Sequence, residues 1–251
     1  MNRLSEWAGS TALAMLRRLV GLRGTSEATT LTAAAKPGNT LVQEARLLLH
    51  VGCGHATLDS IPLTGFHQSN WQEVRLDADE SVDPDIVGTM VNMDAVADGY
   101  ADALFSSHGI EHLYWHDVPM ALAEFRRVLK KDGFVVITCP DVQAAAQMIA
   151  EDKMFETAYQ SAAGPITPFD ILYSYRPFVA ANPEWMSHHC GFTLSTLIAV
   201  LKDAGFATVN GMRRPSGFDL WVLASKSPRT PAEMAALAED YLIPKQQNQG
   251  T

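Results

Sequence analysis

The stretch that most limits how this chain can fold is an apolar run that passes directly into a pair of glycines. Residues 47–54 read LLLHVGCG. Glycine has no Cβ, so a turn at Gly52 and Gly54 lets a ligand approach the backbone and offers N–H groups to negative charge. Ligands of open parallel sheets bind at the carboxyl ends of the strands. We therefore expect a ligand-binding turn after the first strand, although a tight structural turn uses the same residues.

Short apolar runs alternate with helical patterns through most of the chain, which is typical of βα units and a mainly parallel sheet. We expect strands at Leu47–Val51, Glu73–Asp77, Asp85–Gly88, Ala103–Ser107, Phe134–Thr138, Ala207–Met212 and Leu220–Ala224. One helix is predicted after the N-cap Asp117, and another runs from the N-cap Thr193 to Gly205. Pro62 and Gly65 interrupt the segment after the first strand, so a helix there must be short or distorted.

The chain divides by composition into four parts. Residues 1–23 predict a basic amphipathic helix, which could lie on a membrane surface or pack on protein. Residues 24–44 are typical of a linker, and residues 45–227 predict one α/β domain. Within that domain, residues 151–190 are rich in proline and aromatic side chains without a clear period, which indicates an irregular insertion that forms a lid or substrate wall. Residues 228–251 predict a short helix at 232–241 and a flexible polar end.

Charge and cysteine content exclude some classes of protein. The net charge is −9, with 28 acidic and 19 basic residues, which argues against a nucleic-acid partner and favours a small-molecule or protein partner. The 3 cysteines have no CxxC spacing, so neither a disulfide framework nor a cysteine zinc site is indicated. This usage predicts a reducing, cytoplasmic location.

The end of the second strand indicates which kind of ligand the turn binds. Asp77 stands there, where a carboxylate can accept hydrogen bonds from both ribose hydroxyls of a nucleoside. Between Asp77 and Asp98 there are acidic residues and no basic one, so a phosphate-bearing cofactor would be repelled. Thr57 replaces the third glycine of the dinucleotide motif, which disfavours a dehydrogenase. The pattern favours a cationic or phosphate-free nucleoside.

These motifs together resemble a known family. From about residue 46 to residue 226 the chain is similar to class I S-adenosylmethionine-dependent methyltransferases of the type 11-like domain, a doubly wound, seven-stranded, Rossmann-like α/β fold. The matching pieces are LLLHVGCG, EVRLDAD, VNMDAV, ADALFSSHGIEHL, EFRRVLKKDGFVVITCPD and GFTLSTLIAVLKDAGF. The resemblance implies S-adenosylmethionine as cofactor and a small-molecule or glycan-precursor acceptor, with O-methylation expected.

The resemblance also implies which residues bind the cofactor. The glycine turn would approach its methionine part, Asp77 its ribose, and Met93 with Asp94 its adenine. The whole expected set is Gly52, Cys53, Gly54, Asp77, Ala78, Met93, Asp94 and Ser107. The sequence departs from the family's pattern at His50, where an acidic residue is usual, and at Ala56, where glycine is common.

A further motif, HxxEH, follows the fourth expected strand at His108, Glu111 and His112. It matches the inverted zinc-peptidase signature, but a peptidase needs its two histidines on a stable helix. Gly109 and Pro119 shorten any helix here. Ubiquinone-type O-methyltransferases have a similar ExxEH segment that can hold a divalent metal, so a metal, an acceptor contact and a purely structural loop remain open. We expect no metal, with these three residues as weak candidates.

Methyl transfer to a hydroxyl needs a base, and histidine is the natural one near neutral pH. The candidate catalytic residues are His108, His112, Asp141 and His188, with His189 beside the last. Two rival hypotheses remain: a non-catalytic scaffold that kept the fold, and a protein whose function is membrane-surface contact through residues 1–23.

Overall fold

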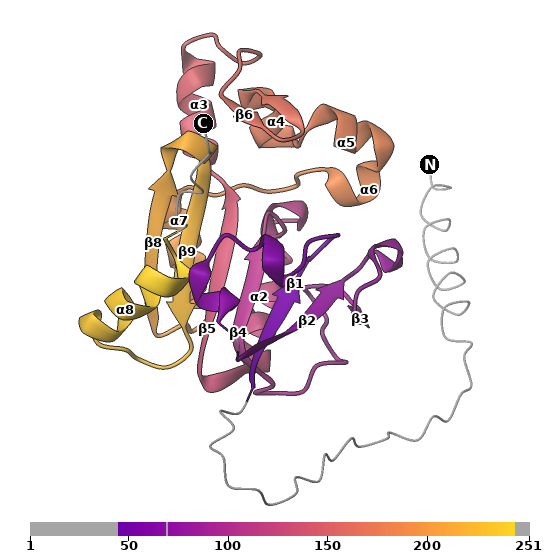
Figure 1. Cartoon of the computed structure of the whole chain (residues 1–251). Coiled ribbons are helices and arrows are strands. Elements are labelled where there is room, and N and C mark those ends of the chain that lie inside the picture. Colours follow the sequence, from indigo (N-terminus) through magenta and orange to yellow (C-terminus); the bar gives the residue numbers. More distant parts are fainter. Residues whose placement is uncertain (1–44, 69, 244–251) are drawn as a thin grey trace, which may run out of the picture. The chain divides into compact units, whose positions relative to one another are not determined.

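The computed structural model describes residues 45–68 and 70–243 (Figure 1). The amphipathic helix expected at 1–23, the linker expected at 24–44 and the polar end of the tail lie outside the described residues. None of the described helices is long and apolar enough to span a bilayer.

A seven-stranded sheet forms the centre of the domain. Its strands are β1 (Arg46–Val51), β2 (Trp71–Asp77), β3 (Ile86–Val87), β4 (Ala101–Ser107), β5 (Leu129–Pro140), β8 (Thr208–Arg214) and β9 (Asp219–Ser225). Their order is β3-β2-β1-β4-β5-β9-β8, and only β9 runs antiparallel to its neighbours. The doubly wound, mainly parallel fold and all seven expected strands are confirmed. The winding direction reverses between β1 and β4, so this is the switch point where such sheets bind ligands.

Both faces of the sheet are buried, as expected for parallel strands. In β1, Leu49 and Val51 belong to one core and Leu48 to the other. The first core includes apolar side chains of α2 (Val118–Val128) and α7 (Leu194–Asp203). The second includes side chains of the 3₁₀ helix η2 (Thr64–His67) and of α8 (Pro231–Tyr241).

The helix signals in the sequence are confirmed at α2 and α7. Asp117 is the N-cap residue of α2, although its side chain makes no capping hydrogen bond. Thr193 caps α7 by accepting a hydrogen bond from the Thr196 N–H. Shortly after that helix, Gly205 has a φ of +88°, a conformation that costs glycine little.

No regular helix follows β1, which confirms the expectation drawn from Pro62 and Gly65. Two 3₁₀ helices, η1 (Leu58–Ser60) and η2, take its place. Gly65 allows a close contact here, because a Cβ would lie 2.3 Å from Cε1 of Tyr241. Helix α8 therefore covers the part of the sheet that a longer first helix would otherwise cover.

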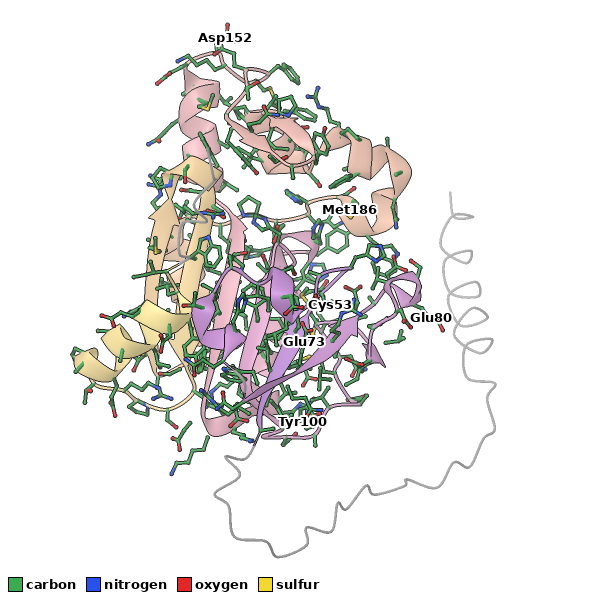
Figure 2. All side chains as sticks on the ribbon, in the orientation of Figure 1. Cys53, Glu73, Glu80, Tyr100, Asp152 and Met186 are labelled. Carbon is green, nitrogen blue, oxygen red and sulfur yellow. The ribbon has the colours of Figure 1, made fainter. Side chains whose placement is uncertain are left out.

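The expectation of an irregular insertion at 151–190 is wrong in detail. After α3 (Val142–Ala150) the chain forms a hairpin of β6 (Tyr159–Ser161) and β7 (Gly164–Ile166), followed by α4 (Pro168–Tyr173), α5 (Arg176–Ala181) and α6 (Pro183–Met186). Each element is too short to show a period, which is why the sequence did not reveal it. In Figure 1 these elements lie beyond the end of β5, on the carboxyl side of the sheet. Figure 2 places Cys53 on the side of Met186 and the insertion, and Tyr100 toward the opposite end of the sheet.

The remaining short elements are η3 (Glu80–Val82), η4 (Ile110–His112) and η5 (Pro215–Gly217). Of these, η4 follows β4 at the switch point of the sheet.

Candidate active site at the strand ends

The glycine turn and the carboxylate of Asp77 meet at adjoining strand ends. Gly52 and Gly54 have φ values of +65° and +51°, which explains why glycine occupies both positions. The Gly54 N–H donates a hydrogen bond of 2.7 Å to Asp77 Oδ2, and the Asp79 N–H donates one of 2.9 Å to Oδ1. A carboxylate has about four acceptor sites, so these two bonds leave Asp77 able to accept more.

Met90 lies between the exits of β1 and β4. A Cβ added to Gly52 or to Gly109 would lie 2.6 Å or 2.5 Å from its Cε. Both glycines are therefore needed for this packing. Methionine is flexible and unbranched, so its side chain can move when a ligand enters the space between the two exits.

Arg75 supports the glycine turn from β2, a role that sequence reasoning missed. Its Nε donates to the Ala56 carbonyl over 3.1 Å, and its Nη1 donates to the Asp83 carbonyl over 2.7 Å. Its Nη2 also donates to the Gly54 carbonyl. One guanidinium thus joins the turn after β1 to the loop after β2. The only signal was a lone basic residue inside EVRLDAD, next to an acidic stretch.

The other residues expected to bind the cofactor differ in how far their side chains are exposed. Met93 is 1% exposed and packs in the first core, whereas Asp94 is exposed. Of that expected adenine pair, Asp94 is the one whose side chain can reach a ligand. The Ser107 hydroxyl lies 2.8 Å from Thr138 Oγ1, where β4 and β5 end side by side. Burial raises the pKa of the Cys53 thiol to about 11, so it stays protonated near neutral pH.

The unusual His50 in β1 has a structural partner. It is buried, and its Nδ1 lies 2.7 Å from Glu73 Oε1. The second oxygen of Glu73 accepts a hydrogen bond from the Leu58 N–H over 2.8 Å. The acidic residue that is usual in β1 is absent, but Glu73 on β2 lies beside that position. Its hydrogen bond to the Leu58 N–H fixes the segment after the glycine turn.

His108 begins the HxxEH motif in a strained conformation. Its φ is +50°, in the left-handed region, which is uncommon for residues other than glycine and is found more often at functional sites. Its Nδ1 lies 3.3 Å from Glu111 Oε1, and its Nε2 lies 3.9 Å from Asp219 Oδ2. Desolvation works to lower the pKa of His108, but the two carboxylates outweigh it and raise the pKa to about 9. The two carboxylates thus favour the protonated form of His108.

Asp219 is a buried acid that the sequence analysis missed. It lies at the start of β9 with 1% exposure, and Arg214 donates to both of its oxygens, through Nε over 2.9 Å and through Nη2. Burial raises the pKa of Asp219, but His108 and Arg214 more than offset this and lower it. No sequence signal marks Asp219 as part of the site, because β9 lies next to β5 only in the folded sheet.

Backbone hydrogen bonds join the end of the insertion to η4. The N–H groups of His189 and Cys190 donate to the Glu111 carbonyl over 2.9 Å and 3.1 Å. In the same place, His112 Nδ1 lies 3.0 Å from the Ser187 carbonyl. These contacts bring His188, which is distant in sequence, beside the HxxEH motif.

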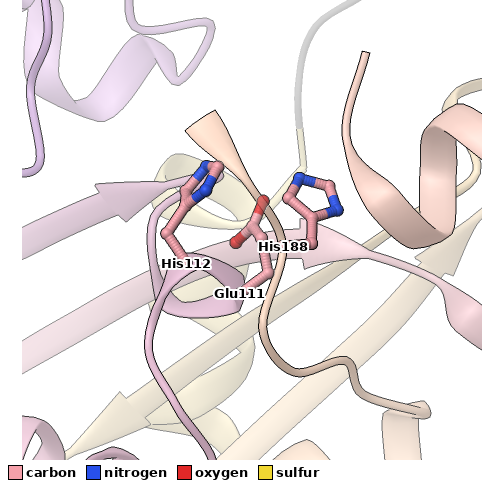
Figure 3. A group of neighbouring side chains, drawn as sticks. All are labelled: Glu111, His112 and His188. Carbon is pink, nitrogen blue, oxygen red and sulfur yellow. The ribbon is translucent and has the colours of Figure 1, made fainter. Parts of the chain in front are cut away.

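Glu111, His112 and His188 form a compact group, shown in Figure 3, with the Glu111 carboxylate between the two rings. One ligand atom from each lies within 4.8 Å of the others. His108 is not a member of this group. The inverted-peptidase hypothesis fails here as well, because η4 spans only Ile110–His112 and leaves His108 outside it.

Asp141, expected as a catalytic residue, has both carboxylate oxygens engaged in structural hydrogen bonds. Its Oδ1 accepts hydrogen bonds from the N–H groups of Gln143 and Ala144 and so caps α3, and its Oδ2 accepts one of 2.6 Å from Arg213 Nε. Both oxygens of this buried carboxylate are thus engaged in holding α3 to β8.

Replacing Asp141 by alanine is expected to lower the free energy of unfolding by about 1–3 kcal/mol, because a helix cap and a charge-assisted hydrogen bond are lost. Asp141→Asn should recover part of this loss, since asparagine also caps helices. Urea denaturation measures the change. The rate of methyl transfer per folded molecule should stay unchanged, and a large fall in that rate would restore a catalytic role for Asp141.

A cavity of about 470 Å³ lies within the insertion beside this site. Its lining residues are Phe169, Tyr173, Ser174, Arg176, Val179, Ala180, Ser187 and His188. The volume is in the range of small-molecule sites, and the lining combines apolar and aromatic side chains with the polar Ser174, Arg176, Ser187 and His188. Burial lowers the pKa of His188, so it presents a neutral imidazole to this cavity near neutral pH.

Residues 49–137, which include the glycine turn, Asp77 and η4, match a family model described as a methyltransferase domain. This part of the chain is a class I S-adenosylmethionine-dependent methyltransferase domain. The match covers β1 to the middle of β5, the half of the sheet that contains the switch point. Among curated proteins, no sequence gives a significant match to this methyltransferase.

Several solved structures are similar to this methyltransferase in fold. A putative S-adenosylmethionine-dependent methyltransferase from Listeria monocytogenes has 13% identity and a TM-score of 0.49, over 74% of this chain and 92% of that one. A possible histamine N-methyltransferase from Thermotoga maritima has 15% identity and a TM-score of 0.48, over 74% and 84%. The 1,6-didemethyltoxoflavin-N1-methyltransferase of Burkholderia thailandensis, solved with S-adenosylhomocysteine, has 14% identity and a TM-score of 0.47, over 74% and 72%.

Proposed function

We propose that this methyltransferase transfers the methyl group of S-adenosylmethionine to a hydroxyl of a small-molecule acceptor, such as a glycan precursor, that binds in the cavity of the insertion. The observation that carries the proposal is the position of His188, which joins the cavity to the side chains at the exit of β4. His188 lines the cavity and is also a member of the Glu111–His112–His188 group at the exit of β4.

The cofactor would bind at the switch point. Asp77 would accept hydrogen bonds from the ribose hydroxyls, the turn at Gly52 and Gly54 would approach the methionine part, and Asp94 would lie near the adenine. The segment from Asp77 to Asp98 contains no basic side chain, which suits a cofactor such as S-adenosylmethionine that has a positive charge and no phosphate.

The reaction itself asks little of the protein. The acceptor oxygen forms a bond to the methyl carbon while the carbon–sulfur bond breaks, so the sulfonium becomes a neutral thioether and the hydroxyl proton passes to a basic side chain or to solvent. Such a transfer depends mainly on aligning oxygen, carbon and sulfur and on keeping water out. The insertion would supply both by enclosing the acceptor.

The described cysteines suit a reducing compartment, and we place the enzyme in the cytoplasm on that ground. All three are free thiols. Burial raises the pKa of Cys139 and, to about 12, that of Cys190, so these thiols are unreactive near neutral pH.

The test is transfer of a labelled methyl group from S-adenosylmethionine to a panel of hydroxyl- and amine-bearing metabolites. Labelled product from hydroxyl acceptors supports the proposal, and product from amines alone overturns O-methylation. Absence of S-adenosylmethionine binding by calorimetry would favour the non-catalytic scaffold.

Filling the cavity should block the acceptor without disturbing the cofactor. Ala180 is exposed and lines the cavity. We expect Ala180→Trp to lower kcat/KM at least about tenfold, because the indole occupies acceptor space. Binding of S-adenosylhomocysteine should stay as in the wild type. Ala181→Trp is the matched control, since Ala181 is exposed on the same helix but does not line the cavity; equal losses in both variants would contradict the assignment.

A further inference from the structure

Glu111 is a buried carboxylate whose charge is left without hydrogen bonds. It is 1% exposed, and within the described part of the chain neither of its oxygens has a hydrogen-bond partner. The nearest charged group, His108 Nδ1, lies 3.3 Å away but lacks the alignment of a hydrogen bond. His108 is thus an ion-pair partner of one oxygen, but both oxygens stay without a hydrogen bond, which is costly for a buried carboxylate unless a further partner such as a metal ion satisfies them.

The two histidines beside Glu111 are oriented as metal ligands are. His112 Nδ1 lies 3.0 Å from the Ser187 carbonyl, and His188 Nδ1 lies 3.1 Å from the Ile171 carbonyl. A carbonyl only accepts, so each Nδ1 must carry the proton and each Nε2 keeps its lone pair. Metal-binding histidines usually have this arrangement, in which the second ring nitrogen donates to a carbonyl or carboxylate.

We propose that Glu111, His112 and His188 bind one divalent transition-metal cation, such as Zn²⁺, Mn²⁺, Fe²⁺ or Co²⁺. Two imidazoles and one carboxylate suit these ions, whereas Mg²⁺ and Ca²⁺ prefer oxygen ligands. The ligand atoms lie within 4.8 Å of one another, and metal–ligand bonds are about 2.0–2.2 Å, so a small inward movement of the side chains closes the site.

The ligands come from two parts of the chain that only the fold brings together. Glu111 and His112 belong to η4 after β4, and His188 belongs to the return of the insertion. A cation bound by all three therefore fastens the insertion to the sheet. Three protein ligands also leave a coordination position open, and His188 lines the acceptor cavity, so the acceptor oxygen is the natural occupant. This last step rests on the proposed O-methylation, but cation binding itself does not.

His108 is excluded from the ligand set although sequence reasoning included it. Its Nδ1 faces Glu111 and its Nε2 faces Asp219, so both nitrogens point to carboxylates already within the site. His108 remains next to the cation as a neighbour of Glu111.

The test uses the full chain, stripped of metal with a chelator and then titrated with Co²⁺. We expect about one Co²⁺ per chain, a visible d–d absorption spectrum of the bound ion and a higher melting temperature. Elemental analysis of the untreated protein should show a transition metal at a comparable level. Glu111→Gln and His188→Gln should each weaken Co²⁺ binding on the order of 100-fold or more. Loss of a residue that only hydrogen-bonds to a metal ligand already costs about 10–100-fold in affinity, and loss of the ligand itself should cost at least as much.

His189→Gln is the matched control, because His189 is the adjacent histidine, is exposed and stacks on Tyr114 at 4.3 Å instead of joining the group. It should bind Co²⁺ within about twofold of the wild type. No Co²⁺ spectrum in the wild type, or equal weakening by His189→Gln and His188→Gln, overturns the proposal. All of these measurements are made without S-adenosylmethionine, so they succeed or fail independently of methyl transfer.

Discussion

Replacing Asp77 by alanine should weaken binding of S-adenosylhomocysteine about 100-fold or more. The carboxylate would accept hydrogen bonds from both ribose hydroxyls, and each hydrogen bond to a charged group contributes about 1.5–3 kcal/mol. Losing two of them costs about 3 kcal/mol or more, and every 1.4 kcal/mol is tenfold in Kd. Titration calorimetry measures the loss directly. The rise in melting temperature that the product causes in the wild type should nearly disappear, because that rise depends on the ratio of ligand concentration to Kd.

Two further variants separate ligand contact from loss of structure. Asp77 also accepts hydrogen bonds from the N–H groups of Gly54 and Asp79, so Asp77→Ala loosens the turn as well. Asp77→Asn keeps an oxygen acceptor, so its Kd for S-adenosylhomocysteine should lie between those of Asp77→Ala and the wild type. Glu80→Gln changes an exposed acid of the same stretch and should leave Kd unchanged. Wild-type affinity in Asp77→Ala would remove the proposed cofactor site.

Phe66→Ala is expected to lower the free energy of unfolding by about 3–5 kcal/mol, the usual cost of deleting a large buried aromatic side chain. Phe66 is fully buried in the second core, and its ring centroid lies 4.9 Å from that of Tyr241 and 5.2 Å from that of Trp71. These rings belong to η2, α8 and β2, so the cavity would open where three elements meet. Urea denaturation measures the loss.

The control for Phe66→Ala is Phe155→Ala. Phe155 is 62% exposed, and substitutions on the surface usually change the free energy of unfolding by less than about 0.5 kcal/mol. A loss below about 1.5 kcal/mol for Phe66→Ala would show that this core collapses around the deletion and is not held rigid by its neighbours.

Sequence patterns predicted the sheet well because parallel strands are buried on both faces. Apolar runs such as LLLHV are long enough to recognise and are separated by glycine, proline and helix caps. The insertion was harder for the opposite reason. The helices α4 and α5 have 6 residues each, fewer than two turns, so their apolar spacing has no period to detect.

Those parts of the candidate site that are adjacent in sequence could be predicted. The parts that only the fold brings together could not. The glycine turn and HxxEH are local in sequence, and the structure places both at the strand ends of the candidate site. Asp219 joins the site only through strand pairing, and His188 only through the hydrogen bonds of the insertion return to Glu111. No spacing in a single sequence encodes such contacts. At Asp141 a carboxylate after a strand is compatible both with catalysis and with a helix cap, and the structure shows the cap.

The position of β9 has a consequence for how the protein is made. Among the described strands of this sheet it is synthesised last, yet it lies between β5 and β8 in the interior of the sheet. Until it is synthesised, β5 has an unpaired edge that can pair with other chains. In a nascent or truncated polypeptide that stops before residue 219, the apolar strand β5 therefore has an exposed edge. Such fragments should aggregate unless a chaperone covers this edge.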